Sequence, residues 1–429
     1  MTARANPFSQ RRGACPGLST PMPTGDGLLV RLHSTGTIPV ASFAALCAAA
    51  RECGNGVVEI TARGSIQVRG LNAGSAPRFA AAVAALNIAA ADGVPVLTNA
   101  LAGLDSAENL DTAALAADLR GALARGSIAA KLAPKVSVII DGGGVLSLDG
   151  VAADIRLHAE RIDGAVVLLV SIAGDESNAR ALGAIAPGDG VAAVGRLLDI
   201  VARGGHTSRA RDVLATSGIE PFHAAIAGLL QSSAHPRLPD NKQRAEPIGI
   251  HRLRDGWLAC GIGLAFGHAD AATLEQLAAT AEAFGAGGMR AAGRTLMVIG
   301  LTNKTAPAFV AAAERQGFIV RADDPRCRVI TCAGAPICTS ALIAARAIAP
   351  AAVATAVLNP ALTVHLSGCA KGCAHSGKAV LTIVGTPVGC AIVANGTVRD
   401  APFAMVATDE LPAAIARYAS EAKREDSHV

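Results

Sequence analysis

The sequence has few aromatic and few charged side chains. Aromatic residues make up 3% of its 429 positions, with one Trp and one Tyr, and charged residues make up 17%. Hydrophobic residues reach 51%, so the chain can bury a large core and is not of the disordered class. The net charge of +4 is small, and basic residues stand singly among acidic ones. This pattern excludes the basic stripe of a nucleic-acid-binding protein.

Long apolar runs and a secretion signal are also missing. Runs such as 44–50 are short and rich in Ala, well below the roughly 20 residues of a membrane span. The first residues lack the apolar centre of a secretory signal. Ten cysteines in a chain of this length are too sparse for a disulfide scaffold. We therefore expect a protein of the reducing cytoplasm that has neither a membrane nor a nucleic acid as partner.

Four of the ten cysteines stand in two spaced pairs. Five residues separate Cys332 from Cys338, and three separate Cys369 from Cys373. Thiolates are the soft ligands of iron–sulfur clusters, and two pairs brought together by a fold supply all four corners of one cluster. Zinc knuckles usually have about two to four residues within each pair. A cluster is the preferred interpretation, and four unrelated buried thiols are the alternative.

A strand–helix–strand–strand–helix pattern occurs early in the chain and returns about 230 residues later. This order is typical of a ferredoxin-like α+β unit, and its recurrence indicates an internal duplication. The first copy predicts strands at 28–32, 57–61 and 66–69 and helices at 40–53 and 77–90. The second predicts strands at 257–264 and 294–301 and a helix at 271–284.

A glycine run follows a predicted strand in the first half. The sequence Asp-Gly-Gly-Gly at 141–144 suggests a phosphate-binding loop, but neither a Lys-Ser/Thr pair nor a helix start follows it. A hairpin turn is therefore the favoured interpretation.

The sequence around the second cysteine pair, Ser-Gly-Cys-Ala-Lys-Gly-Cys-Ala-His at 367–375, resembles a motif of the sulfite/nitrite reductase superfamily. Within it, the likeness is greatest to the family of precorrin-3B synthases, whose opening resembles Arg-Arg-Gly-Ala-Cys-Pro-Gly at 11–17. The resemblance covers nearly the whole chain. It implies a duplicated α+β fold with two ferredoxin-like half-domains, each followed by a mixed α/β domain that binds the cluster or a tetrapyrrole. The expected boundaries are 1–95, 96–231, 248–320 and 321–429, with a Pro- and Ser-rich linker at 232–247.

The resemblance also implies roles for individual residues. Cys332, Cys338, Cys369 and Cys373 would bind a [4Fe–4S] cluster, and the last of them is the thiolate that bridges to sirohaem in the reductases. A basic cleft would bind the carboxylates of a tetrapyrrole. The expected substrate-binding residues are Arg12, Arg63, Gln67, Asn99, Lys131, Lys135 and Arg294. A solvated surface position is the alternative for each arginine.

Two departures from the reductases remove positive charge. Ser137 stands where those enzymes have a second lysine, and Thr98 stands where they have an arginine before Asn99. Both departures argue against the reduction of sulfite or nitrite.

Lys371 and His375 are the catalytic candidates beside the last cysteine. Histidine can bind iron, donate a proton or hydrogen-bond a carboxylate, and all three roles stay open for His375.

The expected activity is that of an oxidoreductase whose tetrapyrrole is the substrate. By resemblance, precorrin-3A would react with O2 at C-20 and form a γ-lactone with the ring A acetate, in cobalamin biosynthesis. The cluster would pass electrons from a separate donor, and a mononuclear non-haem iron is a further candidate cofactor. The alternatives are a sirohaem-dependent sulfite or nitrite reductase and a non-catalytic cluster protein.

Overall fold

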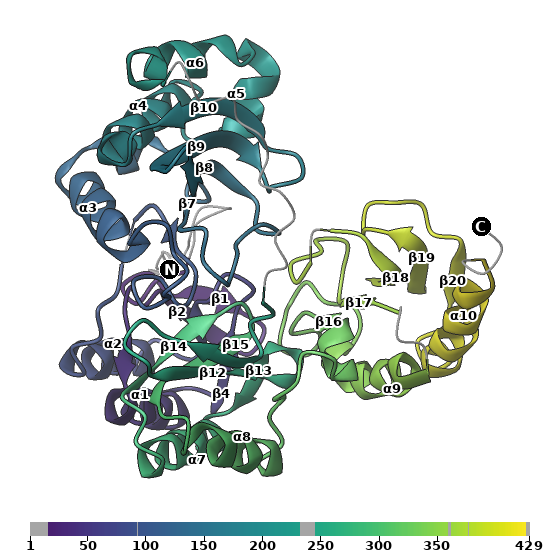
Figure 1. The fold of residues 1–429 in the computed structure, drawn as a ribbon. Coiled ribbons are helices and arrows are strands. Elements are labelled where there is room, and N and C mark those ends of the chain that lie inside the picture. The colour runs from purple at the N-terminus through teal and green to yellow at the C-terminus, as the bar shows by residue number, and fades with distance from the viewer. Residues whose placement is uncertain (1–15, 92, 232–244, 359–361, 376, 426–429) are drawn as a thin grey trace, which may run out of the picture.

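The computed structural model describes residues 16–91, 93–231, 245–358, 362–375 and 377–425, and it forms three lobes (Figure 1). Four five-stranded sheets organise them. The lower lobe in Figure 1 contains two of the sheets, and the upper and right-hand lobes contain one each.

The first sheet is built almost entirely from the first copy of the repeated pattern. Its strand order is β1-β2-β5-β4-β13. Apolar side chains such as Val30 and Val68 alternate with polar ones, and they pack against helices α1 and α2. The bounds are β1 (Met22–Thr24), β2 (Gly27–Leu32), β4 (Val57–Ile60), β5 (Ile66–Leu71), β13 (His268–Asp270), α1 (Val40–Cys53) and α2 (Ser75–Ala85).

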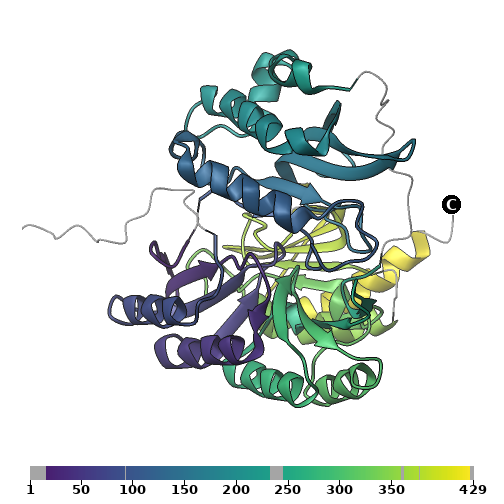
Figure 2. The ribbon, with the colours of Figure 1, turned by 60° about the vertical axis from the view of Figure 1, so that its left-hand side comes forward.

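The second sheet repeats this architecture with the order β11-β12-β15-β14-β3. Helices α7 and α8 cover it, and α1 packs against α7, so both halves share one hydrophobic core. Figure 2 shows the purple and green helices on one side of the two sheets. The bounds are β11 (Gly249–Arg252), β12 (Leu258–Gly263), β15 (Thr295–Leu301), β14 (Gly288–Ala292), β3 (Ile38–Pro39), α7 (Ala271–Ala283) and α8 (Ala306–Arg315).

The two halves exchange their edge strands. β13, from the second half, pairs with β4 of the first sheet, with His268 opposite Glu59. β3, from the first half, pairs with β14 of the second sheet, with Met289 opposite Ile38. Each half therefore completes the sheet of the other.

The third and fourth sheets also match each other. Each has three parallel strands followed by two antiparallel ones, in the orders β6-β7-β8-β9-β10 and β16-β17-β18-β19-β20. This repetition confirms the duplicated α+β fold. The bounds are β6 (Val96–Leu97), β7 (Val138–Asp141), β8 (Ala153–Ile162), β9 (Ala165–Gly174), β10 (Arg180–Ile185), β16 (Val329–Thr331), β17 (Val364–Ser367), β18 (Ala379–Thr386), β19 (Gly389–Gly396) and β20 (Ala404–Val406).

Helices cover the third and fourth sheets. α3 begins where the Asp111 side chain accepts hydrogen bonds from the Ala113 and Ala114 N–H groups. The bounds are α3 (Thr112–Arg125), α4 (Gly190–Arg203), α5 (Ala210–Ser217), α6 (Glu220–Ile226), α9 (Ala345–Leu358) and α10 (Leu411–Glu425), with 3₁₀ turns η1 (Ile128–Lys131), η2 (Pro187–Asp189), η3 (Ala227–Leu229), η4 (Ala265–Gly267) and η5 (Pro325–Arg328). No helix in the described part of the chain is long and apolar enough to cross a membrane.

Two local predictions are wrong. The run 141–144 is not a hairpin turn, because β7 and β8 are parallel and need a longer crossover between them. Asp141 instead accepts hydrogen bonds from Gly143 N–H and Leu148 N–H within that crossover. The helix expected at 77–90 ends at Ala85, because Ala90 forms a β-bridge with Ser34.

Candidate functional site

The four cysteines of the spaced pairs lie on two loops at one edge of the fourth sheet. Cys332 and Cys338 follow β16, and Cys369 and Cys373 follow β17. Because β16 and β17 are parallel neighbours, their carboxyl ends meet at the same edge. All four side chains line one cavity of about 340 Å³, which we call the cysteine cavity.

The sulfurs lie close enough to influence one another. The pKa of the Cys373 thiol is raised first by burial and then by Cys369, Cys332 and Cys338. The Gly368 N–H donates a hydrogen bond of 3.1 Å to Cys332 Sγ. Metal coordination relieves such repulsion, because a coordinated thiol gives up its proton and shares its charge with the metal.

These donors fit a [4Fe–4S] cluster. Four thiolates and an N–H donor to sulfur are the usual surroundings of such a cluster. No three His, Cys, Asp or Glu side chains among the described residues converge closely enough to hold a single metal ion. A four-iron cluster does not need three side chains at one metal ion, because each thiolate binds a different iron. The described residues do not provide a set of three such ligands for a mononuclear iron.

The first sheet supports the loop that carries the first cysteine pair. Gly25 lies in the turn between β1 and β2, where a Cβ would come within 2.7 Å of Pro336 O. Arg69 Nη2, on β5, donates a hydrogen bond of 3.3 Å to Ile337 O, beside Cys338. The position of Cys338 therefore depends on both halves of the chain.

A row of polar side chains crosses the first sheet on the face turned away from its helices. Gln67 on β5 lies opposite Arg31 on β2 and Glu59 on β4. Arg31 Nη2 donates a hydrogen bond of 2.8 Å to Gln67 Oε1, and Gln67 Nε2 donates to Glu59 Oε2. Glu59 and Gln67 are only 7% and 6% exposed, so this polar face is buried. Buried polar groups of this kind are stable only when they are paired.

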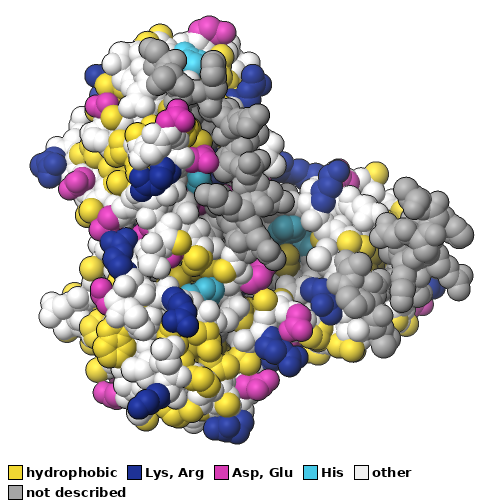
Figure 3. Space-filling model, viewed as in Figure 1, with side chains coloured by type: hydrophobic (Ala, Val, Ile, Leu, Met, Phe, Trp, Pro, Cys, Tyr) yellow, Lys and Arg dark blue, Asp and Glu magenta, His cyan; other side chains and the backbone are white. Residues whose placement is uncertain are grey.

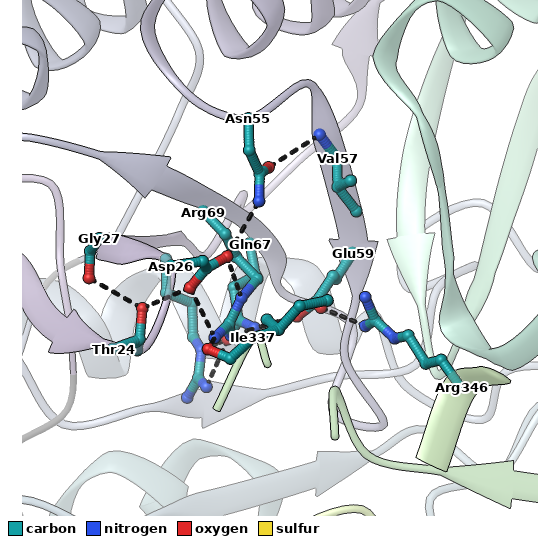
Figure 4. Close-up of polar contacts among 11 residues, drawn as sticks. Thr24, Asp26, Gly27, Asn55, Val57, Glu59, Gln67, Arg69, Ile337 and Arg346 are labelled. Carbon is teal, nitrogen blue, oxygen red and sulfur yellow. Dashed lines mark hydrogen bonds and ion pairs between the residues drawn. The ribbon is translucent and has the colours of Figure 1, made fainter. Parts of the chain in front are cut away.

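An ion pair joins this row of polar side chains to the right-hand lobe of Figure 1, which carries the four cysteines, and further ionic contacts hold the row itself (Figure 4). Arg346 Nη2, on α9, donates to Glu59 Oε1. Arg69 forms an ion pair of 3.2 Å with Asp26 and lies 3.9 Å from Glu59. The network fixes the first sheet against the fourth across the cysteine cavity.

The equivalent face of the second sheet is apolar. Met297 and Ile299 on β15 occupy the repeat positions of Gln67 and Arg69, and they are buried in a cluster with Leu101. The duplicated fold therefore has two equivalent faces of opposite chemistry, and the polar one lines the cysteine cavity.

A second cavity of about 260 Å³ adjoins the cysteine cavity. Arg31 and the turn 61–64 line both. The described lining residues of the second cavity include no Asp or Glu. We call it the arginine cavity after Arg31, Arg63, Arg120 and Arg290.

Positive charge dominates the arginine cavity. The pKa of His33 is lowered to about 4, first by burial and then by the charges of Arg31, Arg63 and Arg120. Ser65 Oγ lies 2.9 Å from His33 Nδ1. The imidazole is therefore neutral near pH 7 and leaves the arginines as the charged groups. Such a site favours an anion.

Comparison with known proteins agrees with this arrangement. The profile of the nitrite/sulfite reductase ferredoxin-like half domain matches residues 20–86. The solved structure of Mycobacterium tuberculosis NirA protein has the same fold, with a TM-score of 0.77 and 18% identity over 91% of this chain and 80% of that chain. A precorrin-3B synthase of Sinorhizobium sp is 41% identical over 413 residues, which are 95% of this chain and 88% of that protein. The chain belongs to the precorrin-3B synthase family.

Membership in the precorrin-3B synthase family applies to the whole duplicated chain. The match to the half domain covers the first ferredoxin-like copy alone, whereas the match to the synthase covers 95% of the chain. The chain is therefore an enzyme of the oxidoreductase class.

Four of the predicted substrate-binding residues of this precorrin-3B synthase family member lie in the two cavities. Arg63 and Asn99 line the arginine cavity, and Gln67 and Arg294 line the cysteine cavity. Arg294 Nη2 donates a hydrogen bond of 2.5 Å to Ala374 O, and burial lowers the pKa of its guanidinium. Their contact with substrate remains a prediction.

The predicted lysines lie elsewhere. Lys131 and Lys135 are exposed at and after η1, and neither lines the two cavities. Ser137, which follows them, is buried and donates its N–H to Asp154 at 2.9 Å. Ser137 directly precedes β7, and both lysines lie before it on the surface of the upper lobe. Arg12 lies outside the described residues.

The catalytic candidates differ in their access to the cysteine cavity. Lys371 lines the cavity, and its Nζ donates a hydrogen bond of 2.7 Å to Ser340 Oγ. His375 does not line it, and its Nε2 lies 3.2 Å from Lys378 O. The His375 ring packs edge-on against buried His365, whose pKa is lowered to about 4, first by burial and then by His375 and Arg294. Lys371 is therefore the better placed to meet a ligand.

Several cavity residues were not predicted from the sequence. Alternation along β4 and β5 assigns Glu59 and Arg69 to an outward face, and nothing local reveals that α9 covers this face. Arg120 and Arg290 come from separate elements and carry no motif. The charged and histidine residues of the two cavities that were not predicted are Arg31, His33, Glu59, Arg69, Arg120, Arg290 and Arg346.

Proposed function

We propose that the chain is a precorrin-3B synthase. It uses O2 to hydroxylate precorrin-3A at C-20, and the ring A acetate closes a γ-lactone, in aerobic cobalamin biosynthesis. Membership in the family supports this activity. One oxygen atom of O2 enters the product, and the other is reduced to water by two electrons from a separate donor together with two protons.

One observation carries the proposal: the four cysteines and a buried polar sheet face line the same cavity. The polar face belongs to one of two equivalent sheets, and its counterpart is closed by apolar packing. A buried polar face at one copy of a repeat, beside four thiols in one cavity, supports the cysteine cavity as the site of the reaction.

Three groups of residues have separate roles in this scheme. Cys332, Cys338, Cys369 and Cys373 would hold the [4Fe–4S] cluster, which supplies electron transfer when bound. Arg294 and Lys371, which line the cavity beside the last cysteine pair, would bind substrate carboxylates. The network of Glu59, Arg69 and Arg346 would keep the walls of the cavity in place.

Anaerobic purification followed by incubation with precorrin-3A, a reductant and ¹⁸O-labelled dioxygen tests the reaction. Mass spectrometry should find one labelled oxygen in a hydroxylated lactone. Rapid consumption of sulfite or nitrite, with no labelled lactone, would overturn the proposal.

A sirohaem-dependent sulfite or nitrite reductase is the second candidate, and the cationic arginine cavity favours it. Two observations stand against it. Thr98, which lines the arginine cavity, carries no charge, and Lys131 and Lys135 lie outside both cavities. Sirohaem that remains bound through purification, detected by its visible absorption, would favour the reductase.

A further inference from the structure

Phe266 has a backbone conformation that bulky residues rarely adopt. It lies in the 3₁₀ turn η4, between β12 and β13, with φ 60° and ψ 17°. In this left-handed region the Cβ atom of an L-residue crowds its own carbonyl group, and glycine is the usual occupant. Strained residues of this kind persist only where the surrounding structure fixes them, and they gather at ligand sites.

Hydrogen bonds and close packing fix the backbone on both sides of Phe266. Leu264 N–H donates to Arg294 O at 3.2 Å, and Gly267 N–H donates to Leu264 O at 2.9 Å. At Gly267 a Cβ would lie 3.2 Å from Ile60 O, so the chain passes close to the end of β4 there. The turn is thus held between the two ferredoxin-like sheets.

The ring of Phe266 lines the cysteine cavity, where it is the only aromatic side chain among the described lining residues. The ring is half-buried and, like Cys332, packs against the apolar core of the fourth sheet. The turn η4 also contacts β16, the strand that leads into Cys332. Phe266 therefore gives the cavity a flat apolar wall beside the loop of the first cysteine pair.

The first half of the chain has no side chain at the equivalent position. Gly36 stands two residues before β3, as Phe266 stands two residues before β13. Gly36 lines the arginine cavity, and a Cβ built on it would meet no atom within 4 Å. A ferredoxin-like half-domain of this chain therefore folds without a ring at this position.

We propose that Phe266 orients the tetrapyrrole: its ring packs against one face of the macrocycle in the cysteine cavity. The inference rests on the proposed function. An aromatic ring on a fixed backbone offers a large contact area and loses little entropy when a ligand binds. Contact with one face limits the tilt of the macrocycle, so the same carbon stays turned toward the reaction.

Turnover of precorrin-3A by the holoenzyme tests this role. Phe266→Leu keeps an apolar side chain but removes the aromatic face. We expect it to raise KM at least about fivefold and to lower the lactone formed per reductant consumed at least about threefold. The remaining reductant should yield hydrogen peroxide, because two electrons and two protons then reduce O2 without insertion. Phe266→Tyr restores the aromatic face, so its KM should be at least about threefold lower than that of Phe266→Leu.

Phe403→Leu is the matched control, because Phe403 is an exposed phenylalanine that lines neither cavity. Its KM should stay within about twofold of wild type. Melting temperatures verify that every variant folds. If Phe266→Leu is unstable, Phe266→Gly, which has the residue of the first half, decides the outcome.

A comparison of Phe266→Gly with Phe266→Ala tests the strain itself. Both variants lack the ring, and alanine keeps a Cβ in the left-handed region whereas glycine does not. We expect the glycine variant to melt at the higher temperature, the reverse of the usual order. A lower melting temperature for the glycine variant would show that the backbone at Phe266 is not strained.

The opposing outcomes are distinct. Wild-type KM and lactone yield in Phe266→Leu overturn the inference, and so does a Phe266→Tyr variant that is as impaired as Phe266→Leu. If the wild-type protein forms no lactone, the proposed reaction fails, and binding of uroporphyrin, a stable porphyrin, decides about the ring. A dissociation constant raised at least about fivefold in Phe266→Leu and recovered in Phe266→Tyr, measured by porphyrin fluorescence, then supports the contact. An unchanged constant, or no binding by wild type, overturns it.

Discussion

Cys338 and Cys369 come from different loops, and each supplies one corner of the proposed cluster. Cys338→Ser should reduce bound iron from about four atoms per chain to less than about one, because serine is a poor ligand for iron in a cluster. Iron analysis and visible absorption of anaerobically purified protein measure the loss. Cys369→Ser should behave in the same way.

Cys327→Ser is the control for this change. Cys327 is exposed in η5, a few residues before the first cluster cysteine, and lies outside both cavities. Its serine variant should retain wild-type iron. Full iron retention in Cys338→Ser would disprove the assignment of the ligands.

His33 should make stability depend on pH. Its folded-state pKa of about 4 lies below the unfolded value of about 6.5, so protonation favours the unfolded chain. Its contribution is complete above pH 6.5 and is lost as the pH falls toward 4. From the shift, wild type should lose up to about 3 kcal/mol more than His33→Gln between pH 7 and 4. Urea unfolding at a series of pH values measures the difference.

An exposed histidine provides the comparison. His206 lies on the surface after α4 and lines neither cavity, so His206→Gln is the control variant. A His33→Gln profile parallel to wild type would show that burial and the neighbouring arginines do not suppress protonation of His33.

At the scale of elements, the contact between β4 and α9 joins two lobes. Arg346→Met removes the main cationic partner of buried Glu59 and leaves Arg69 at 3.9 Å. We expect a loss of about 3 kcal/mol in the free energy of unfolding, because the carboxylate stays buried with weaker compensation. Denaturant unfolding followed by circular dichroism measures it.

The double variant Glu59→Gln/Arg346→Met separates the charge from the packing. Once the carboxylate is neutral, at least half of the lost stability should return. Arg321→Met, at an exposed ion pair with Asp323, should cost less than about 1 kcal/mol. No recovery in the double variant would mean that Arg346 acts through its aliphatic chain.

The elements themselves were largely predictable from the sequence, whereas the site was predictable only in part. α1 matches its expected range of 40–53, because an Ala-rich apolar run between a strand and a glycine turn specifies a helix locally. The cysteine spacing likewise identifies its loops. Glu59 and Arg346 lie far apart in the chain, and their pairing arises only when the fourth sheet docks on the first. Local periodicity contains no signal for such docking.

At the scale of the whole molecule, the duplication could be predicted from the sequence, but the exchange of edge strands could not. β3 and β13 are two and three residues long, too short to show a periodic pattern. Their pairing nevertheless links the halves into one core. The halves should therefore loosen together when either edge strand is displaced.

Gly288→Ala tests this linkage. At Gly288 a Cβ would lie 2.5 Å from Ile38 O, so alanine should force β3 away from β14. We expect a loss of about 1–3 kcal/mol in the free energy of unfolding, the usual cost of overpacking. Gly287→Ala is the matched control, since its Cβ would lie 3.9 Å from the nearest neighbour, Ile299 O.

Hydrogen exchange shows whether the effect spreads between the halves. In Gly288→Ala, amides of β14 in the second sheet and of β4 in the first should exchange faster together, because α1 follows β3 directly and packs in the shared core. Gly287→Ala should leave both unchanged. Faster exchange confined to β14 would mean that the two halves open independently, and the exchanged strands would then be local contacts without a role in coupling the halves.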